Sequence, residues 1–271
     1  MPFTPSHLAA ALPFVRTPLI PAAVAIGTMT PDLFYYLPVA INRETAHSWL
    51  GVVTVDLAFG IALVLLWRFF LREPVIDFMP QWVRARMTPS EWMSPGRLRW
   101  PRVVLLLIVS VLVGCATHVL WDALTHDGAF VHLLPVLYEQ VGPLRVFKWL
   151  QHTSSLLGAV ALVLFIRWWY RRTAVHEVPP SKLAPRGRVV GIIVVLGAGL
   201  AVATYAWLRG FLAHGYSPID NALIFYTVTI GIAAAGLAAV LVCVVWWGLR
   251  FTESSTDGDP AAETTTTRML Q

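Results

Sequence analysis

The segment RVVLLLIVSVLVGCATHVLWDALTH, residues 102–126, is apolar and long enough to cross a lipid bilayer, yet it ends in polar and charged side chains. His118, Asp122 and His126 follow one another at intervals of four, so a helix places them along one stripe. Ionisable groups are costly in hydrocarbon. A polar stripe at the end of a membrane helix therefore indicates a functional site with partners elsewhere in the chain.

The composition of the 271-residue chain is that of a membrane protein. It is 57% hydrophobic and 13% charged, with a mean hydropathy of +0.66, whereas charged residues make up about 25% of ordinary soluble domains. Cys115 and Cys243 each lie inside an apolar run without a CxxC partner, which indicates small buried hydrophobic side chains. The isoelectric point of 9.6 comes from arginine-rich loops and does not imply nucleic-acid binding.

Five apolar runs approach or exceed the roughly 20 residues that span about 30 Å of hydrocarbon. They cover residues 51–71, 103–122, 154–170, 189–213 and 222–248. The sequence therefore predicts an all-α fold, a polytopic membrane helix bundle of about five spans plus an N-terminal helical hairpin. We expect residues 1–253 to form a single membrane-embedded domain. The small, polar and acidic residues 254–271 indicate a disordered tail.

Basic residues predict the orientation of the spans. Six arginines occur from Arg72 to Arg102 inclusive, and a second basic segment covers residues 171–188, so the positive-inside rule places the loops 72–102 and 171–188 in the cytoplasm. The intervening segments 123–153 and 214–221 contain only two lysine or arginine residues, Arg145 and Lys148. We expect a protein of the inner (cell) membrane with its N-terminus outside and its C-terminus in the cytoplasm.

The first fifty residues contain an apolar stretch that prolines interrupt. Pro13, Arg16, Pro18 and Pro21 argue against one straight span through residues 8–30. We favour two short helices, about 5–15 and 18–29, that fold as a hairpin near the outer surface.

On this map, polar side chains with metal-ligating chemistry gather at the outer side. They are His7, Asp32, His47, His118, Asp122, His152 and His214. Neutral imidazole and carboxylate suit zinc and related ions, and facing helices of a bundle bring such groups together. His118 and Asp122 supply two ligands from one helix face, and His47 heads the preceding antiparallel span. We predict that these three converge on a divalent metal, that Asp32 approaches the same point, and that His7 joins as a further ligand.

Plainer interpretations of the same residues remain open. A single histidine at a helix end, such as His126, His132, His152 or His214, is more often a hydrogen-bonded or capping residue than a ligand. Asp122 and Asp56 could each bond a polar group on a neighbouring helix. We keep His126, His152 and Asp56 as candidate additional ligands.

Four stretches carry a resemblance to a known family. MPFTPSHLAAALPF, GTMTPDLFYY, AHSWLGVVTVDL and ATHVLWDALTH resemble the uncharacterised bacterial membrane family known as domain-of-unknown-function family 4184. Their order of His, Pro-Asp, His-Ser and His-x3-Asp also resembles inner-membrane predicted metal-dependent hydrolases and, more distantly, the zinc-dependent phospholipase C and single-strand nuclease fold. That second resemblance covers the ligand-like residues within about 1–130. It implies that His47, His118 and Asp122 bind one metal, that His7 shares Asp122 with a second, and that Asp32 is the base beside the attacking water.

The sequence thus favours a membrane-bound metal-dependent hydrolase. Zinc, as one or two ions, would lower the pKa of a bound water to roughly 7, and Asp32 would orient or deprotonate that water. A site at the head-group level predicts a lipid head group or other phosphoester as substrate, with Arg43 or Arg209 to hold the anion. The alternative is a non-enzymatic membrane protein with an ion or proton pathway or a structural metal site. The few polar residues in the cytoplasmic half of the spans favour a one-sided site.

Overall fold

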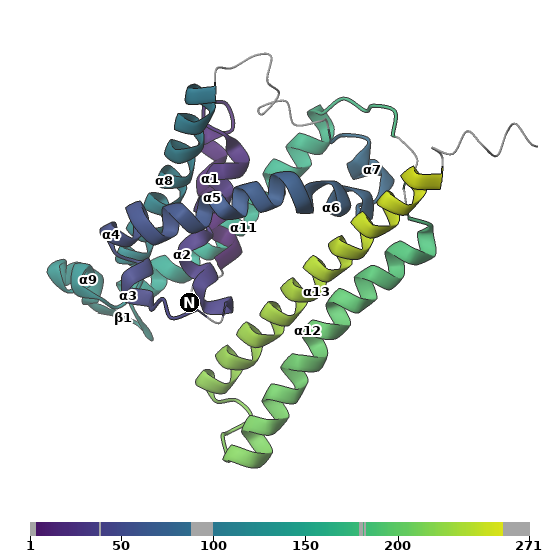
Figure 1. Cartoon of the computed structure of the whole chain (residues 1–271). Coiled ribbons are helices and arrows are strands. Elements are labelled where there is room, and N and C mark those ends of the chain that lie inside the picture. Colours follow the sequence, from purple (N-terminus) through teal and green to yellow (C-terminus); the bar gives the residue numbers. More distant parts are fainter. Residues whose placement is uncertain (1–3, 38, 88–99, 179–180, 182, 257–271) are drawn as a thin grey trace, which may run out of the picture. The chain divides into compact units, whose positions relative to one another are not determined.

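The computed structural model describes residues 4–37, 39–87, 100–178, 181 and 183–256, which are almost entirely helical (Figure 1). Five helices are long and apolar enough to cross a membrane, as predicted: Trp49–Phe78, Trp100–Thr125, Val146–Arg172, Pro185–His214 and Asn221–Arg250. The chain divides into two compact units. One contains Met1–Arg68 and Ala85–Glu177, and the other contains Phe69–Arg84 and Val178–Gln271.

The first unit contains the N-terminal elements, three of the long helices and a small hairpin. Its N-terminal elements are the 3-10 helix η1 (Thr4–Phe14), α1 (Pro21–Gly27), α2 (Thr30–Leu33), the 3-10 turn η2 (Phe34–Tyr36) and α3 (Arg43–Ala46). The first long helix consists of α4 (Trp49–Gly51), the π-helical η3 (Val52–Asp56), α5 (Leu57–Leu66), the π-helical η4 (Trp67–Leu71) and α6 (Arg72–Phe78), of which the last ten residues belong to the second unit. After α8 (Trp100–Thr125) come α9 (Ala129–Leu133), α10 (Pro135–Tyr138), the antiparallel strands β1 (Gln140–Val141) and β2 (Leu144–Arg145), and α11 (Val146–Arg172).

The predicted N-terminal hairpin is present. η1 ends at Phe14, one residue after Pro13, and α1 begins at Pro21, where a proline needs no backbone N–H in the first turn. The two helices contact one another, and α1 also packs along α8. Residues 4–36 therefore fold back on themselves beside the second span and bring His7 and Asp32 to its polar end.

Glycines set the distance between α1 and α8. A Cβ on Gly27 would lie 2.5 Å from the carbonyl oxygen of Val111, and one on Gly114 would lie 2.8 Å from the Cα of Gly27. Neither position has room for a side chain, so the two backbones are in direct contact. Small residues allow such close helix packing within membranes, where van der Waals contact and hydrogen bonds drive association.

Two side chains of α8 bind the two ends of α1. The Ser110 hydroxyl accepts a hydrogen bond of 2.9 Å from the backbone N–H of Ile20, and His118 Nδ1 lies 2.8 Å from the carbonyl oxygen of Thr28. Both bonds are buried, and they satisfy helix-end groups that lack partners within α1. The apolar core between them contains Ala23, Val52, Val64, Val111 and Cys115.

The second unit contains α7 (Gln81–Arg84) and two long helices, α12 (Pro185–His214) and α13 (Asn221–Thr256), joined by a turn with Gly215 at φ +67°. α12 and α13 pack through small residues, because a Cβ on Gly199 would lie 3.0 Å from that of Ala235. At the other end of the hairpin, the buried Asp77 of α6 accepts a hydrogen bond of 2.9 Å from Trp246 Nε1 and pairs with Arg84 at 3.4 Å.

The basic and polar connections contain more helix than the sequence suggests. Residues 72–84 of the predicted loop 72–102 include α6 and α7, and α11 starts at Val146, eight residues before its apolar run. α13 continues to Thr256, so that only the first part of the predicted tail 254–271 is described, while residues 88–99, 179–180, 182 and 257–271 lie outside the described residues. The predicted bounds are shorter because hydropathy detects only the apolar part of each helix. The helical backbone hydrogen bonds extend into the polar residues on either side.

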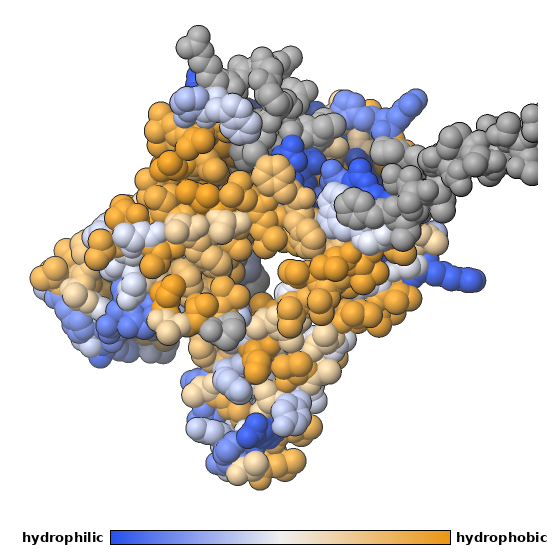
Figure 2. Space-filling view, in the orientation of Figure 1, coloured by the Kyte–Doolittle hydropathy of each residue, from blue (hydrophilic) through white to orange (hydrophobic). Residues whose placement is uncertain are grey.

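Apolar side chains cover the long helices on the face shown in Figure 2, where orange surfaces dominate. Large aliphatic residues are exposed along them, including Leu200 at 70% and Val163 at 64%. In water, such surfaces would favour association, but a bilayer covers them with lipid chains of the same polarity.

We predict that Gly114→Ala destabilises the first unit, because the new Cβ would collide with α1. Such overpacking lowers the free energy of unfolding by about 1–3 kcal/mol. The higher helix propensity of alanine offsets roughly 1 kcal/mol of this loss, so we expect a net destabilisation. Thermal unfolding of the purified protein in detergent measures the change. Gly236→Ala is the matched control, since a Cβ there meets no atom within 4 Å. Equal melting temperatures for the two variants would contradict the close contact.

Candidate metal centre

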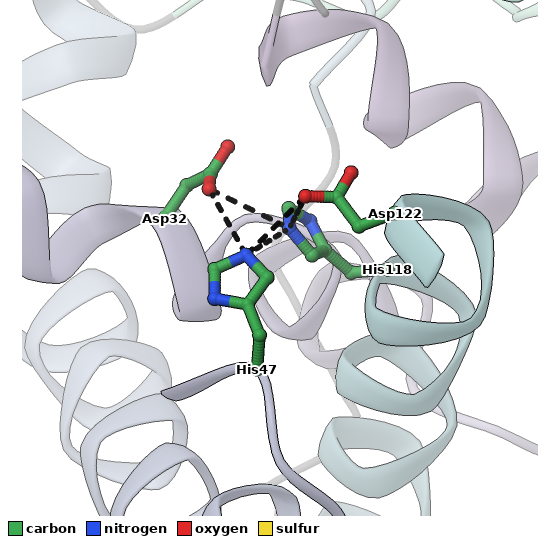
Figure 3. Close-up of side chains that lie close together, drawn as sticks. All are labelled: Asp32, His47, His118 and Asp122. Carbon is green, nitrogen blue, oxygen red and sulfur yellow. Dashed lines mark hydrogen bonds and ion pairs between the residues drawn. The ribbon is translucent and has the colours of Figure 1, made fainter. Parts of the chain in front are cut away.

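Four ionisable side chains from three segments converge at the polar end of α8. Asp32 lies in α2, which starts with a proline in its first turn, and His47 follows α3. His118 and Asp122 lie one turn apart on α8, as their spacing predicts. Their ligand atoms all lie within 4.8 Å of one another (Figure 3).

Two capping turns hold His47 in place. The Asn42 side chain accepts a hydrogen bond of 2.8 Å from the backbone N–H of Thr45 and caps α3, and Ser48 accepts one of 2.9 Å from Gly51 and caps the first long helix. His47 is the residue between these helices. The caps before and after His47 therefore fix its backbone, and its ring lies beside His118 of α8.

The separations between ligand atoms match one metal coordination sphere. His47 Nε2 lies 3.3 Å from His118 Nε2, 3.3 Å from Asp122 Oδ2 and 3.4 Å from Asp32 Oδ1. His118 Nε2 lies 3.6 Å from Asp32 Oδ1 and 3.8 Å from Asp122 Oδ2. Ligands about 2.1 Å from a tetrahedral zinc ion lie about 3.4 Å apart. The expected convergence of His47, His118 and Asp122 is thus found, with Asp32 as a fourth member.

Backbone carbonyls orient both imidazole rings. His118 Nδ1 lies 2.8 Å from the carbonyl oxygen of Thr28, and His47 Nδ1 lies 3.1 Å from that of Arg43. A carbonyl oxygen can only accept, so each Nδ1 carries the proton and donates it. In the neutral form of each ring, Nε2 then presents its lone pair to the shared centre, which is the arrangement that metal-binding histidines have in proteins.

Charge in the group also fits a cation. Burial alone would lower the pKa of His47, but hydrogen bonds to Asp122 and Asp32 outweigh it and raise this pKa to about 9. The two carboxylates therefore stabilise positive charge at this point. A proton on His47 supplies it when no metal is bound, and a divalent ion would replace that proton.

A second pair of histidines contacts the other oxygen of Asp122. His126 Nδ1 lies 3.3 Å and His7 Nε2 lies 3.5 Å from Asp122 Oδ1. Burial is the main cause that lowers the pKa of His7 and that of His126, each to about 4, so both rings are neutral at pH 7. Neither His7 Nε2 nor Asp122 Oδ1 has a hydrogen-bond partner among the described residues, although both are buried. His7 also stacks on His118, with ring centroids 4.1 Å apart.

Arg43 is the cation beside this centre. Its guanidinium lies 3.4 Å from Asp122 Oδ2, and its side chain is 43% exposed. Tyr35, which forms a side-chain hydrogen bond with Arg43, is half-buried, and burial raises the pKa of its hydroxyl to about 12. Arg43 therefore stands between the buried carboxylate and the surface.

Three residues considered from the sequence are not among the four whose ligand atoms lie within 4.8 Å of one another. Asp56 is fully buried in the π-helical turn η3, and neither of its carboxylate oxygens accepts a hydrogen bond from a described residue. His152 is exposed on α11. Arg209 belongs to the second unit, where it lines a cavity of about 610 Å³ with Tyr205, His214 and Tyr226.

Two contributors were not predicted. Gln151 is 1% exposed and its amide nitrogen lies 3.1 Å from His126 Nε2. A lone glutamine at the start of an apolar helix gives no sequence signal of such a contact. Tyr35 lies in the motif GTMTPDLFYY, where aromatic residues indicate a membrane interface. Only the structure shows that its side chain forms a hydrogen bond with Arg43.

The comparisons with known proteins identify a family. The family described as Domain of unknown function (DUF4184) matches residues 1–253. No curated protein and no solved structure matches the chain.

We predict that the purified protein holds about one to two equivalents of a divalent ion and that His118→Ala loses it. Loss of an outer-shell partner weakens metal binding roughly 10–100-fold, and loss of a ligand should cost more. Metal analysis after dialysis measures the content. His132→Ala is the control, because His132 pairs with Asp127 on the surface, away from the group. Unchanged metal content in His118→Ala would refute the centre.

Metal affinity should also depend on pH. Because the proton of His47 must leave before a metal binds, the apparent affinity should rise about tenfold per pH unit until the pH approaches the His47 pKa of about 9. Titrations at several pH values check this slope.

Proposed function

Since the chain belongs to the DUF4184 family, we propose that it is a membrane-bound metal-dependent hydrolase that cleaves phosphoesters of lipid head groups. The observation that carries this proposal is the spacing of 3.3–3.8 Å among the ligand atoms of His47, His118, Asp32 and Asp122. A catalytic zinc site has three protein ligands and one open position. Three of these side chains would therefore hold the ion, and the fourth, Asp32 in our proposal, would face the bound water.

Zinc is the proposed metal, because zinc binds imidazole nitrogen together with carboxylate oxygen, whereas magnesium and calcium prefer sites in which all ligands are oxygen atoms. When bound, zinc would act as a Lewis acid and supply a hydroxide at neutral pH. A second ion is part of the proposal, since His7 Nε2 and Asp122 Oδ1 lie 3.5 Å apart and are buried without a hydrogen-bond partner among the described residues. His126 would orient this oxygen, because its Nε2 accepts from the Gln151 amide and its Nδ1 therefore carries the ring proton.

Residues of the chain would bind the substrate and move its protons. Arg43 offers a planar cation to a phosphate oxygen, at the exposed edge of the centre. In the hydrolysis, the oxygen of water forms a bond to phosphorus while the bond from phosphorus to the leaving oxygen breaks. One proton of that water passes to a carboxylate, for which Asp32 is our candidate, and the leaving alcohol takes up a proton.

Asp32 has two candidate roles that an experiment separates. The sequence suggests a general base, whereas its Oδ1 lies 3.4 Å from His47 Nε2, as a ligand would. If Asp32 is mainly a base, Asp32→Ala should keep its metal and lose about 10²–10⁴-fold in rate. If it is mainly a ligand, metal and activity should disappear together.

We predict zinc-dependent hydrolysis of bis(p-nitrophenyl) phosphate and of phosphatidylglycerol by the purified protein. His118→Ala should abolish both activities, and Arg43→Ala should raise KM because it removes the cation for the substrate. Release of p-nitrophenol and of the lipid head group measures the rates. His132→Ala, at a surface ion pair, should behave as the wild type.

The absence of hydrolysis in a metal-loaded protein would instead favour a structural metal site. The observation behind that second candidate is that the group joins α8 to α2 and to the segment before α4, so an ion would cross-link three parts of the first unit. In that case, removal of the metal should lower the melting temperature without affecting any reaction.

The proposed site faces the outer side of the inner membrane. Support comes from basic residues of the first unit, since Arg102 lies in the first turn of α8 and Arg171 and Arg172 end α11, at the ends of these helices away from the metal centre. Translocation of the opposite ends would bring the centre to the outer head groups.

Cysteine labelling tests this orientation. Glu139 and Glu177 are exposed and flank α11, and the native Cys115 and Cys243 are buried. We predict that Glu139→Cys in intact cells reacts with a membrane-impermeant maleimide, while Glu177→Cys reacts only after lysis. The opposite pattern would place the centre in the cytoplasm.

A further inference from the structure

A cavity of about 730 Å³ lies in the first unit between η1, α8 and α11. Its volume falls in the range of about 300–1,000 Å³ that is usual for sites of small ligands. Small side chains leave this space open. Ala9 and Ala10 contribute from η1, Ala123 from α8 and Gly158 from α11.

Most of the cavity wall is apolar and continuous with the membrane-facing surface. Leu120 and Trp121 of α8 line it and are 52% and 39% exposed, and Phe130 of α9 is 47% exposed. Leu120 and Trp121 stand near the end of a predicted span, where hydrocarbon meets the head groups. The polarity of the wall therefore matches a hydrocarbon chain and not a polar metabolite.

One edge of the same cavity belongs to the candidate metal centre. His47 lines it and is a member of the metal-ligating group. His7 lines it as well, and its Nε2 lies 3.5 Å from Asp122 Oδ1. An occupant that fills the apolar part therefore ends at two histidines, close to Arg43 and to the place of a divalent cation.

Contacts around the cavity keep its walls fixed. The hydroxyl of Ser6 donates a hydrogen bond of 2.8 Å to the carbonyl oxygen of Ser155, and Trp121 Nε1 donates one of 3.1 Å to Ser154. A Cβ on Gly158 would lie 2.9 Å from the carbonyl oxygen of Ser6. η1 and α11 are thus in direct contact on one side of the space, so the cavity does not depend on a loose gap between helices.

We propose that this cavity binds the hydrocarbon chain of a single-chain or diacyl phospholipid whose phosphate lies at the metal centre. The assignment of the head group rests on the proposed function, whereas the assignment of the chain rests on the cavity. The chain enters sideways from the bilayer between α8 and the helices around it, so the lipid need not leave the membrane. The apolar chamber would hold the tail of such a lipid, and the candidate metal centre at its His47 edge, with Arg43 beside Asp122, would hold the anionic head.

Photolabelling tests the proposal without relying on turnover. The probe is a dodecyl phosphonate with a diazirine at the end of its chain, whose carbon–phosphorus bond resists hydrolysis. With the full-length protein in lipid nanodiscs, labelling should concentrate on peptides that contain residues 4–14, 117–124 and 154–158. Excess unlabelled dodecyl phosphonate should compete with it, which distinguishes a binding site from surrounding lipid.

Two matched substitutions in α8 locate the chain. Leu120→Trp fills the cavity and should reduce competable labelling about tenfold. Leu105→Trp is the control, because Leu105 lies on the same helix, is 59% exposed and does not line the cavity. Ala10→Phe fills the same space from η1 and shows whether an effect of Leu120→Trp comes from the cavity or from a local defect.

The outcomes separate the two proposals. Competable labelling that Leu120→Trp and Ala10→Phe reduce, together with about tenfold weaker labelling by a dodecanol diazirine that lacks the phosphonate, supports the lipid site. Labelling that does not saturate, or that both filling variants leave unchanged, overturns it. If the dodecanol probe labels as well as the phosphonate, the head group is not bound at the centre and the proposal fails. A competable site in a protein without hydrolase activity would refute the proposed function and keep the chain-binding cavity.

Discussion

The hydrogen bond between His118 Nδ1 and the carbonyl oxygen of Thr28 links the fold to the candidate metal centre. It satisfies the end of α1, and it leaves the lone pair of His118 Nε2 facing Asp32, His47 and Asp122. The bond forms only because Gly27 and Gly114 let α1 lie directly against α8. The same contact thus holds the N-terminal hairpin in place and orients a histidine nitrogen of the group that could hold a metal ion.

Burial of charge explains why the polar groups gather in one place. An isolated carboxylate near hydrocarbon is unstable unless it is paired, protonated or bound to a cation. Asp122 meets this condition through five neighbours, since His7 and His126 contact one oxygen and His47, His118 and Arg43 approach the other. Asp56 is also buried, yet it has no hydrogen-bond partner among the described residues, so it differs from the other membrane carboxylate of this unit.

The proposed chemistry and the proposed lipid site depend on the same arrangement. His47 belongs to the metal-ligating group and also lines the apolar cavity. The capping turns of Asn42 and Ser48 hold this residue between α3 and the first span. A hydrolase that acts on membrane lipids needs such a junction, because the scissile bond lies where the apolar chain meets the polar head.

The sequence by itself determined the helical membrane fold, the N-terminal hairpin and the shared face of His118 and Asp122, since hydropathy, prolines and helix period are local properties. It also suggested His7, Asp32 and His47 as partners, but only packing could decide that His7 and His47 approach different oxygens of Asp122 and that Asp32 faces the two imidazoles of His47 and His118. Only the tertiary structure left Asp56 and His152 outside the group of four convergent ligand residues, placed Arg209 in the second unit and brought Gln151 to His126. The reason is that contacts between residues tens of positions apart depend on how closely helices approach, and here glycine backbones fix that distance.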